Sequence, residues 1–493
     1  MSLVLLPLRT AMLSCICCNI RTTGKAPLNG KCAKPIHLVD QELYKKYGRL
    51  FGSFEAGKPA LYVSEPDLIK LVLVRDFTSL SDRKPIKFGD PVLDNMMTAA
   101  SLDRWRVIRA VASPAFSASR VKKLSSIIAD CARITAEHLR TCEGDLEVKT
   151  FYANFGLDVI ARCSFGIKLK PHSDVTNKFV IEAKRAFSRN MTLPLIAIYL
   201  FPGLIQWFNI KLLNFDIIRC FKDLAGKAIR ERDKGGHKSE DYLKLLMDAR
   251  EERHDTNGYP NRRETPERSA LSEVEVLAQC VVMFLGGQDS ISSLIAHTVY
   301  LLALHPDKQT KLREEVDRCF SSHGEEISPE VISKLDYLHG VVSEALRLFP
   351  PATRIDRSTT EDYALGDTGI TLPKGCTITV PIYAMHRDPL NFIDPDSFIP
   401  ERFSEDNVST ISPYTYLPFG AGPKGCLGTH LALLAVKLCL LYSLQDVEFF
   451  RTSKTKVPLK FYNGFGLLHS APFSVGIKKR STAPTSTSTH NTN

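Results

Sequence analysis

The sequence lacks several features that would place it in a protein class at once. Its 493 residues show no internal repeat, which excludes solenoid and propeller arrays. No run of Lys or Arg is interleaved with aromatic residues, which argues against a nucleic-acid partner. The 13 cysteines are odd in number and have no regular spacing, so they indicate a reducing compartment rather than a disulfide framework.

Acidic residues are also missing from the N-terminal segment, where the first is Asp40. Residues 1–20 are apolar apart from a few interruptions, and two interpretations remain open. Residues 1–24 form either a membrane anchor, which is short against the roughly 20 apolar residues of a spanning helix, or an acid-poor targeting peptide. A linker is expected over 25–46.

The composition that is present is typical of a globular protein, with 44% hydrophobic and 24% charged residues. The formal net charge of +10 suits an anionic membrane surface or an acidic protein partner. We expect one catalytic domain over 47–478. A disordered tail is expected over 479–493, because Ser, Thr and Pro dominate that stretch.

The periodicity of apolar residues predicts a mainly helical body with a minor sheet component, of the α+β type. A hairpin is predicted over 50–63, and helical patterns dominate from there to about Phe349. Short strands and turns are predicted over 356–398, and a buried helix directly after Cys426.

A long helical pattern over 272–304 is interrupted at its centre by Gly286, Gly287, Asp289 and Ser290. Each Gly costs about 1 kcal/mol relative to Ala in a helix interior, and a buried acid costs more unless it is paired. The alternative is a purely structural role, in which the glycines allow a close helix crossing and the buried acid stabilises the fold. We favour a functional reason, because glycines let a ligand approach while an acid and a hydroxyl can move protons.

Cys426 lies in a Gly- and Pro-rich loop, 419–428, that directly precedes the predicted helix. A helix N-terminus stabilises a thiolate through the helix dipole. The local chemistry therefore predicts a deprotonated cysteine that holds a metal.

Five motifs together resemble the cytochromes P-450, and they occur in that family's order from about Tyr47 to Lys478. The motifs are Trp105-x-x-x-Arg109, Gly286-Gly287-Gln288-Asp289-Ser290, Glu344-x-x-Arg347, Pro400-Glu401-Arg402-Phe403 and Phe419-x-x-Gly422-x-Lys424-x-Cys426-x-Gly428. The stretches 335–338, 347–350 and 383–389 further resemble the drug-metabolising family 3 enzymes and their relative thromboxane synthase.

The resemblance implies a cytochrome P-450 fold and a haem-thiolate monooxygenase that inserts one atom of dioxygen into a lipophilic small molecule. It also implies electrons from NADPH through a flavoprotein reductase. The expected location is the endoplasmic reticulum membrane with a cytosolic catalytic domain, and a mitochondrial location is the alternative. Two other functions stay open: an isomerase of lipid peroxides and a non-catalytic haem-binding protein. Asp289 and Ser290 favour the monooxygenase, because peroxide rearrangement needs no proton relay to dioxygen.

The resemblance assigns Cys426 as the axial ligand of haem iron. It assigns the other haem-binding positions to Trp105, Arg109, Arg354, Phe419 and Lys424. The cationic members would neutralise the haem propionates, with Lys424 as a point charge where the family usually has the bidentate Arg.

Asp289 and Ser290 would deliver protons to dioxygen, with Ser290 standing where the family usually has Thr. Glu344, Arg347 and Arg402 would form a structural ion cluster that supports the cysteine loop. Substrate contacts are expected from 85–103, 187–215, 352–353 and 465–468. The charge-free stretch 193–208, within the second of these, either dips into a membrane interface or packs in the core.

Overall fold

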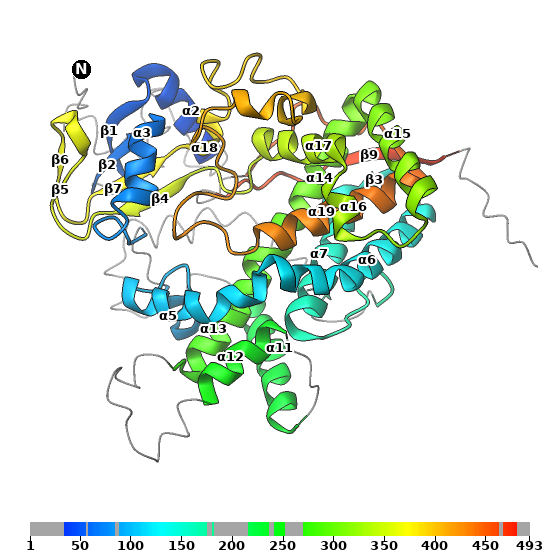
Figure 1. Ribbon diagram of the computed structural model, residues 1–493, viewed down its shortest axis with the longest axis horizontal. Helices are drawn as coiled ribbons and strands as arrows, with labels where there is room; N and C mark the ends of the chain where they lie inside the picture. Colours follow the sequence, from blue (N-terminus) through cyan, green and yellow to red (C-terminus); the bar gives the residue numbers. More distant parts are fainter. Residues whose placement is uncertain are drawn as a thin grey trace, which may run out of the picture.

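Helices make up most of the protein, and strands form three small sheets in the part of the chain that the structure describes (Figure 1). The computed structural model describes residues 34–55, 58–83, 88–174, 180–181, 215–235, 241–251, 270–462 and 467–480. The prediction of a mainly helical body with a minor sheet component is confirmed.

Most helices of the described residues lie to one side of the largest sheet and below it, while α2, α3 and α18 lie beside its strands (Figure 1). The α-helices are α2 (Ile36–Tyr47), α3 (Pro66–Lys70), α4 (Pro91–Asp94), α5 (Leu102–Ala112), α6 (Ala118–Arg140), α7 (Val148–Phe165), α11 (Phe215–Asp233), α12 (Tyr242–Glu251), α13 (Glu273–Met283), α14 (Asp289–Leu304), α15 (Pro306–His323), α16 (Pro329–Ser333), α17 (Asp336–Leu348), α18 (Ile382–Met385) and α19 (Thr429–Asp446).

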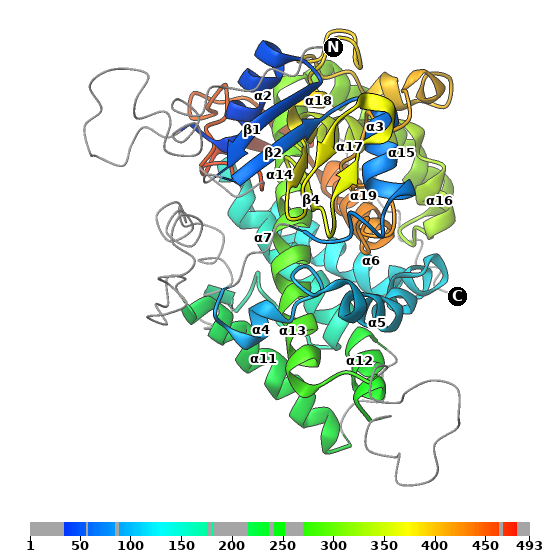
Figure 2. The same ribbon diagram turned by 90° about the vertical axis from the view of Figure 1, so that its left-hand side faces the viewer.

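The largest sheet joins parts of the chain that are far apart in sequence, as Figure 2 shows with the sheet toward the viewer. The predicted hairpin is β1 (Leu50–Glu55) paired antiparallel with β2 (Lys58–Val63). Strand β2 pairs in parallel with β7 (Thr377–Val380), and β7 pairs antiparallel with β4 (Ile355–Ser358). The sheet therefore brings the segment after α17 next to the N-terminal hairpin.

Two smaller sheets complete the strand content of the described residues. Strands β5 (Tyr363–Ala364) and β6 (Thr371–Leu372) form a short pair, as the turn-rich pattern after residue 356 predicts. Strand β9 (Ser474–Lys479) lies between β3 (Gly144–Glu147) and β8 (Val447–Phe450).

The predicted helix over 272–304 forms one column through the core, seen in Figure 2 running down behind the sheet. Ser272 caps it, and Glu275 returns the bond to the Ser272 backbone as a capping box. Between α13 and α14 lies one π-helical segment, Phe284–Gln288, which contains both glycines. Such π-bulges occur often at functional sites, because they free a carbonyl from the helical ladder.

Regular structure extends past both expected boundaries of the catalytic domain. Residues 36–46, expected as part of a linker, belong to helix α2, whose His37, Asp40 and Tyr44 are buried. At the other end the domain does not stop at 478, because Lys479 belongs to β9 and Arg480 forms an ion pair with Asp317 at 2.6 Å.

Several expectations fall outside the described residues. These are the anchor or targeting segment 1–24, the tail beyond residue 480, the stretch 193–208 and parts of the expected substrate segments. Among the described residues, only the column Glu273–Leu304 is long and apolar enough to cross a membrane. Half of its most apolar window is buried inside the protein, so it is the core helix of this fold.

Candidate functional site

The cysteine loop is built as a tight turn that leads into α19. Gly420 and Gly422 have φ of +73° and +71°, a conformation that favours glycine. A Cβ on Gly422 would lie 1.9 Å from the Leu73 carbonyl oxygen, so no larger residue fits there. The Cys426 backbone N–H donates to the Phe419 carbonyl at 2.8 Å. Helix α19 begins three residues later, so Cys426 stands at its N-terminal approach, and its side chain is exposed.

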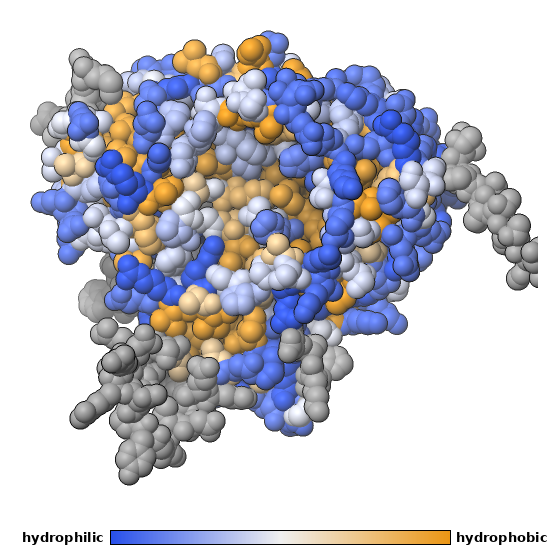
Figure 3. Space-filling view, in the orientation of Figure 1, coloured by the Kyte–Doolittle hydropathy of each residue, from blue (hydrophilic) through white to orange (hydrophobic). Residues whose placement is uncertain are grey.

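Phe419 has a role in the fold of this loop through that carbonyl, and its ring packs against the helical core. Figure 3 shows one face of the molecule that is hollowed near its centre, where hydrophobic residues gather. Gly286 of the π-helical segment has nothing within 4 Å of where a Cβ would stand, so it also borders open space.

Four cations lie near one another beside the cysteine loop, and the carboxylates of Asp82 and Asp356 act on some of them without pairing with them. This cation cluster consists of Lys424, Arg83, Arg109 and Arg357. The Lys424 Nζ lies 5.3 Å from the centre of the Trp105 ring, which is itself buried. None of the four cations forms an ion pair with another residue in the described ranges.

The electrostatics of the cation cluster are unfavourable as they stand. Burial and the charges of Arg83 and Arg357 lower the pKa of Lys424 to about 8. Burial and the charge of Arg83 lower the pKa of Arg357 to about 10. The Arg357 Nε is buried without a hydrogen-bond partner, although its Nη1 donates to the Asp356 carbonyl. A buried cation without a partner is costly, so this cluster is suited to a ligand that carries at least one anionic group.

Arg354, which the sequence assigns to the haem propionates, does not belong to this cluster. Its guanidinium donates to Glu55 at 2.8 Å, to the Tyr62 hydroxyl at 3.1 Å and to both carboxylate oxygens of Asp40. Two buried carboxylates already neutralise Arg354, which argues against its predicted role at the propionates. Arg354 directly precedes β4, whereas Arg357 lies within it and belongs to the cation cluster.

Arg83 is a second member that sequence reasoning missed. It belongs to none of the sequence motifs, but the backbone of Asp82 pairs with Ser358 beside β4. That pairing places Arg83 next to Arg357. Part of the Arg83 side chain is exposed, yet the protein around its guanidinium lowers its pKa.

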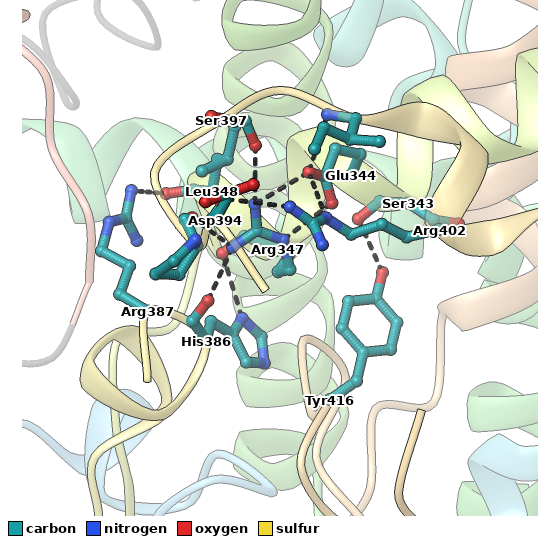
Figure 4. Close-up of polar contacts among 12 residues, drawn as sticks. Ser343, Glu344, Arg347, Leu348, His386, Arg387, Asp394, Ser397, Arg402 and Tyr416 are labelled. Carbon is teal, nitrogen blue, oxygen red and sulfur yellow. Dashed lines mark hydrogen bonds and ion pairs between the residues drawn. The ribbon is translucent and has the colours of Figure 1, made fainter. Parts of the chain in front are cut away.

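The Glu344–Arg347 pair has the opposite character, since every charge in it is satisfied (Figure 4). Both residues have fully buried side chains on α17, and two parallel hydrogen bonds of 2.7 and 2.8 Å join them. Arg347 also donates to three backbone carbonyls, those of His386, Pro395 and Ser397. Arg402 adds a 3.3 Å contact to Glu344, which confirms the predicted three-residue cluster.

His386 connects this pair to the cysteine loop, a role that the sequence does not reveal. Its Nδ1 lies 3.1 Å from the Arg347 carbonyl, and its Nε2 accepts from the Leu417 backbone N–H at 3.0 Å. Leu417 in turn accepts from Gly420, within the turn before Cys426. Complete burial lowers the pKa of His386 to about 3, so the ring is neutral and both bonds are maintained.

Asp289 and Ser290 lie at the start of α14, directly after the π-helical segment. The Ser290 hydroxyl donates to the carbonyls of Gly286 at 2.7 Å and Gly287 at 3.2 Å. Asp289 points elsewhere, toward Lys149 of α7 at 3.6 Å and His469 at 3.8 Å. The structure therefore places the two predicted proton carriers on adjacent positions with different partners.

Two of the expected substrate segments meet in the structure. Ala352 pairs with Leu467 as an isolated bridge, and the Leu468 N–H donates to the Pro351 carbonyl at 2.9 Å. The Thr353 hydroxyl is buried there without a hydrogen-bond partner. In the described ranges no group of three or more His, Cys, Asp or Glu side chains could hold a metal ion.

Comparisons with known proteins agree with this geometry. The family model described as cytochrome P450 matches residues 20–476. The chain is 32% identical to cytochrome P450 3A25 of Mus musculus over 431 residues, covering 85% of this chain and 83% of that protein. It is 33% identical to cytochrome P450 3A5 of Homo sapiens over 435 residues, with 85% and 83% covered. Cytochrome P450 3A18 of Rattus norvegicus is 32% identical over 431 residues, with 85% and 84% covered.

Proposed function

Because the chain belongs to the cytochrome P450 family and is a haem-thiolate monooxygenase that uses dioxygen on a lipophilic small molecule, we propose that Cys426 is its axial thiolate. Trp105 and the cation cluster then hold the haem propionates. Bound haem supplies the iron at which dioxygen is activated, and a thiolate ligand favours O–O cleavage.

The observation that carries this assignment is the cation cluster itself. Its members come from α5, β4, the cysteine loop and the segment before residue 84, so the fold brings four like charges together from distant parts of the chain. None of them forms an ion pair within the described chain, whereas two carboxylates on one planar cofactor would pair with them. The exposed Cys426 sulfur beside them completes a site for a cofactor with a metal and acidic groups.

Ser290 and Asp289 are proposed to serve the proton requirement of the reaction. The Ser290 hydroxyl bonds the carbonyls at the π-helical segment and can hold a proton beside open space at Gly286. Ser lacks the methyl group that restricts Thr, so its hydroxyl has more rotational freedom. We expect Ser290→Thr to raise the yield of product per NADPH, and an unchanged ratio would count against this role.

The proposed partner is a flavoprotein reductase that carries electrons from NADPH, and the proposed site is the endoplasmic reticulum membrane with a cytosolic catalytic domain. The excess of basic residues supports an acidic partner or an anionic membrane surface. Residues 1–24 are proposed as the anchor. Release of the protein from membranes by an alkaline carbonate wash would contradict an integral anchor.

The direct test is the absorption spectrum of the reduced protein with carbon monoxide. We expect wild-type protein to show the red-shifted Soret band of thiolate-ligated haem, and Cys426→Ser to lose it. NADPH consumption with added reductase then supports the monooxygenase. Turnover of a lipid hydroperoxide without reductase would support the isomerase alternative, and neither activity would support a carrier.

A further inference from the structure

One face of α14 carries a column of polar side chains that begins at Asp289 and continues beyond the proposed haem site. Asp289, Ser293 and His297 recur every four residues, so they lie on one side of the helix. The Ser293 hydroxyl is 3.4 Å from an Asp289 carboxylate oxygen. Ser293 and His297 are buried, and Asp289 is only 16% exposed, so this is an interior polar column.

Two side chains from other elements face the upper end of this column. Lys149 of α7 places its Nζ 3.6 Å from one Asp289 oxygen, and His469 places its Nδ1 3.8 Å from the other. The His469 backbone is fixed on both sides, since its carbonyl accepts from Tyr462 and its neighbour Ser470 pairs with Phe461. The ring is therefore held near Asp289 by the fold.

The His469 side chain is buried at one ring nitrogen and accessible to solvent elsewhere, an arrangement that suits proton transfer. Its Nδ1 is buried and has no hydrogen-bond partner, yet 23% of the side chain is accessible. One edge of the ring thus faces Asp289 while another part reaches the accessible surface. A separation of 3.8 Å is longer than a hydrogen bond, and such contacts commonly tighten only when an active site is loaded.

We propose that His469 relays protons from solvent to Asp289 and that Lys149 positions Asp289 for this transfer. The inference rests on the proposed function, because it supplies protons to the reaction proposed above. In the step, the Nδ1–H bond of His469 breaks as the proton binds Asp289, and Nε2 takes a proton from solvent. The ring stays neutral overall, and Asp289 gains one proton.

The charges around His469 support this assignment. Burial lowers the pKa of His469, Asp289 raises it, and Lys149 lowers it. Lys149 also faces His297, whose pKa burial lowers to about 3. His469 is consequently neutral near pH 7, with one nitrogen available as donor and one as acceptor.

The test compares His469→Gln and His469→Phe with wild-type holoenzyme, and His339→Gln of α17 serves as the control. Gln can keep a hydrogen bond to Asp289 but cannot exchange protons as an imidazole does, while Phe keeps only the volume. We expect both His469 variants to lose roughly 10-fold in product formed per NADPH, with matching release of hydrogen peroxide. The His339→Gln control should give the same product per NADPH and the same hydrogen peroxide release as wild type.

Two further readouts separate a relay from a structural contact. Hydrogen peroxide brings its own protons, so turnover driven by peroxide should be unchanged in both variants. The NADPH-driven loss should widen from about pH 6 to pH 8, because the variants draw protons directly from solvent. Melting temperatures of His469→Gln, Asp289→Asn and the double variant should be non-additive, which reports the contact without reference to activity.

Equal losses in NADPH-driven and peroxide-driven turnover would overturn the proposed relay. A wild-type yield of product per NADPH in His469→Gln would overturn it as well. Additive melting shifts would show that the two side chains do not interact. Failure of the proposed function is distinct from these outcomes, since wild-type protein would then lack the carbonmonoxy band of thiolate-ligated haem.

Discussion

Two groups of buried charge flank the cysteine loop, and they differ in one respect. In the Glu344–Arg347 pair every donor meets an acceptor within the protein. In the cation cluster no cation forms an ion pair among the described residues, and burial together with neighbouring cations lowers the pKa of Lys424 and of Arg357. The first arrangement stabilises the fold, whereas the second is complete only with an acidic ligand.

The same contrast appears within one short segment of chain. Arg354 directly precedes β4, and Arg357 lies three residues later, within the strand. Arg354 meets Asp40 and Glu55, while Arg357 meets Arg83 and Lys424. The partners of a buried arginine, and not its burial, therefore indicate whether it stabilises the fold or binds a ligand.

Removal of one partner from the satisfied pair should have the largest effect. Arg347→Ala leaves Glu344 buried without its main partner, which costs about 3–5 kcal/mol. We expect loss of haem incorporation as well as a lower urea midpoint. Arg402→Ala is the matched control and should cost less, because it makes a single contact of 3.3 Å with Glu344. An Arg347→Ala protein with normal haem content would refute the scaffold role.

Arg354→Ala should be nearly as damaging to stability, because it leaves the two buried carboxylates of Asp40 and Glu55 without a cation. Burial already raises the pKa of Asp40 to about 6 with Arg354 present, so loss of the cation raises it further. Arg357→Ala is the contrast, since it removes a repelling charge and should leave the urea midpoint of haem-free protein unchanged or higher. Equal destabilisation by the two variants would contradict the claim that Arg354 stabilises the fold while Arg357 does not.

Acid should weaken the link between the two groups through His386. Its pKa falls from 6.5 to about 3 on folding, so the unfolded state binds more protons between these values. Stability is complete above about pH 6.5 and falls as the pH drops toward 3. We expect His386→Gln to take up about one proton fewer than wild type on unfolding near pH 5, measured from the pH slope of the unfolding free energy. An unchanged slope would show that another group is responsible.

The smallest effect is expected from Lys424→Arg, which tests whether Lys424 of the cation cluster binds a haem propionate. An Arg can grip a carboxylate with two parallel bonds where Lys offers a point charge. Haem should dissociate severalfold more slowly from this variant and faster from Lys424→Met. Identical dissociation rates in all three proteins would remove Lys424 from the propionate site.

The sequence predicts much of this arrangement for identifiable reasons. Glycine spacing and helical periodicity correctly predict the cysteine loop, the start of α19 and the long central helix. The Glu344–Arg347 pair follows from its spacing on one helix, and its neighbour Arg402 from the motif.

The errors have equally physical causes. The sequence does not show which partners an arginine near β4 meets, so it selects Arg354, whereas the structure places Arg357 in the cation cluster. Arg83 and His386 act through contacts with residues far away in the chain, which no local pattern records. Helix α2 is missed because polar side chains, including His37 and Asp40, occupy its buried face.

The central claim is that the unpaired cations bind the haem propionates and the paired arginine does not. Haem transfer to excess apomyoglobin, followed by absorbance, tests it in wild type, Arg357→Ala and Arg354→Ala under conditions where all three stay folded. We predict roughly 10-fold faster transfer from Arg357→Ala, the loss of a charge-assisted bond, and a near wild-type rate from Arg354→Ala. Faster transfer from Arg354→Ala than from Arg357→Ala would contradict the account.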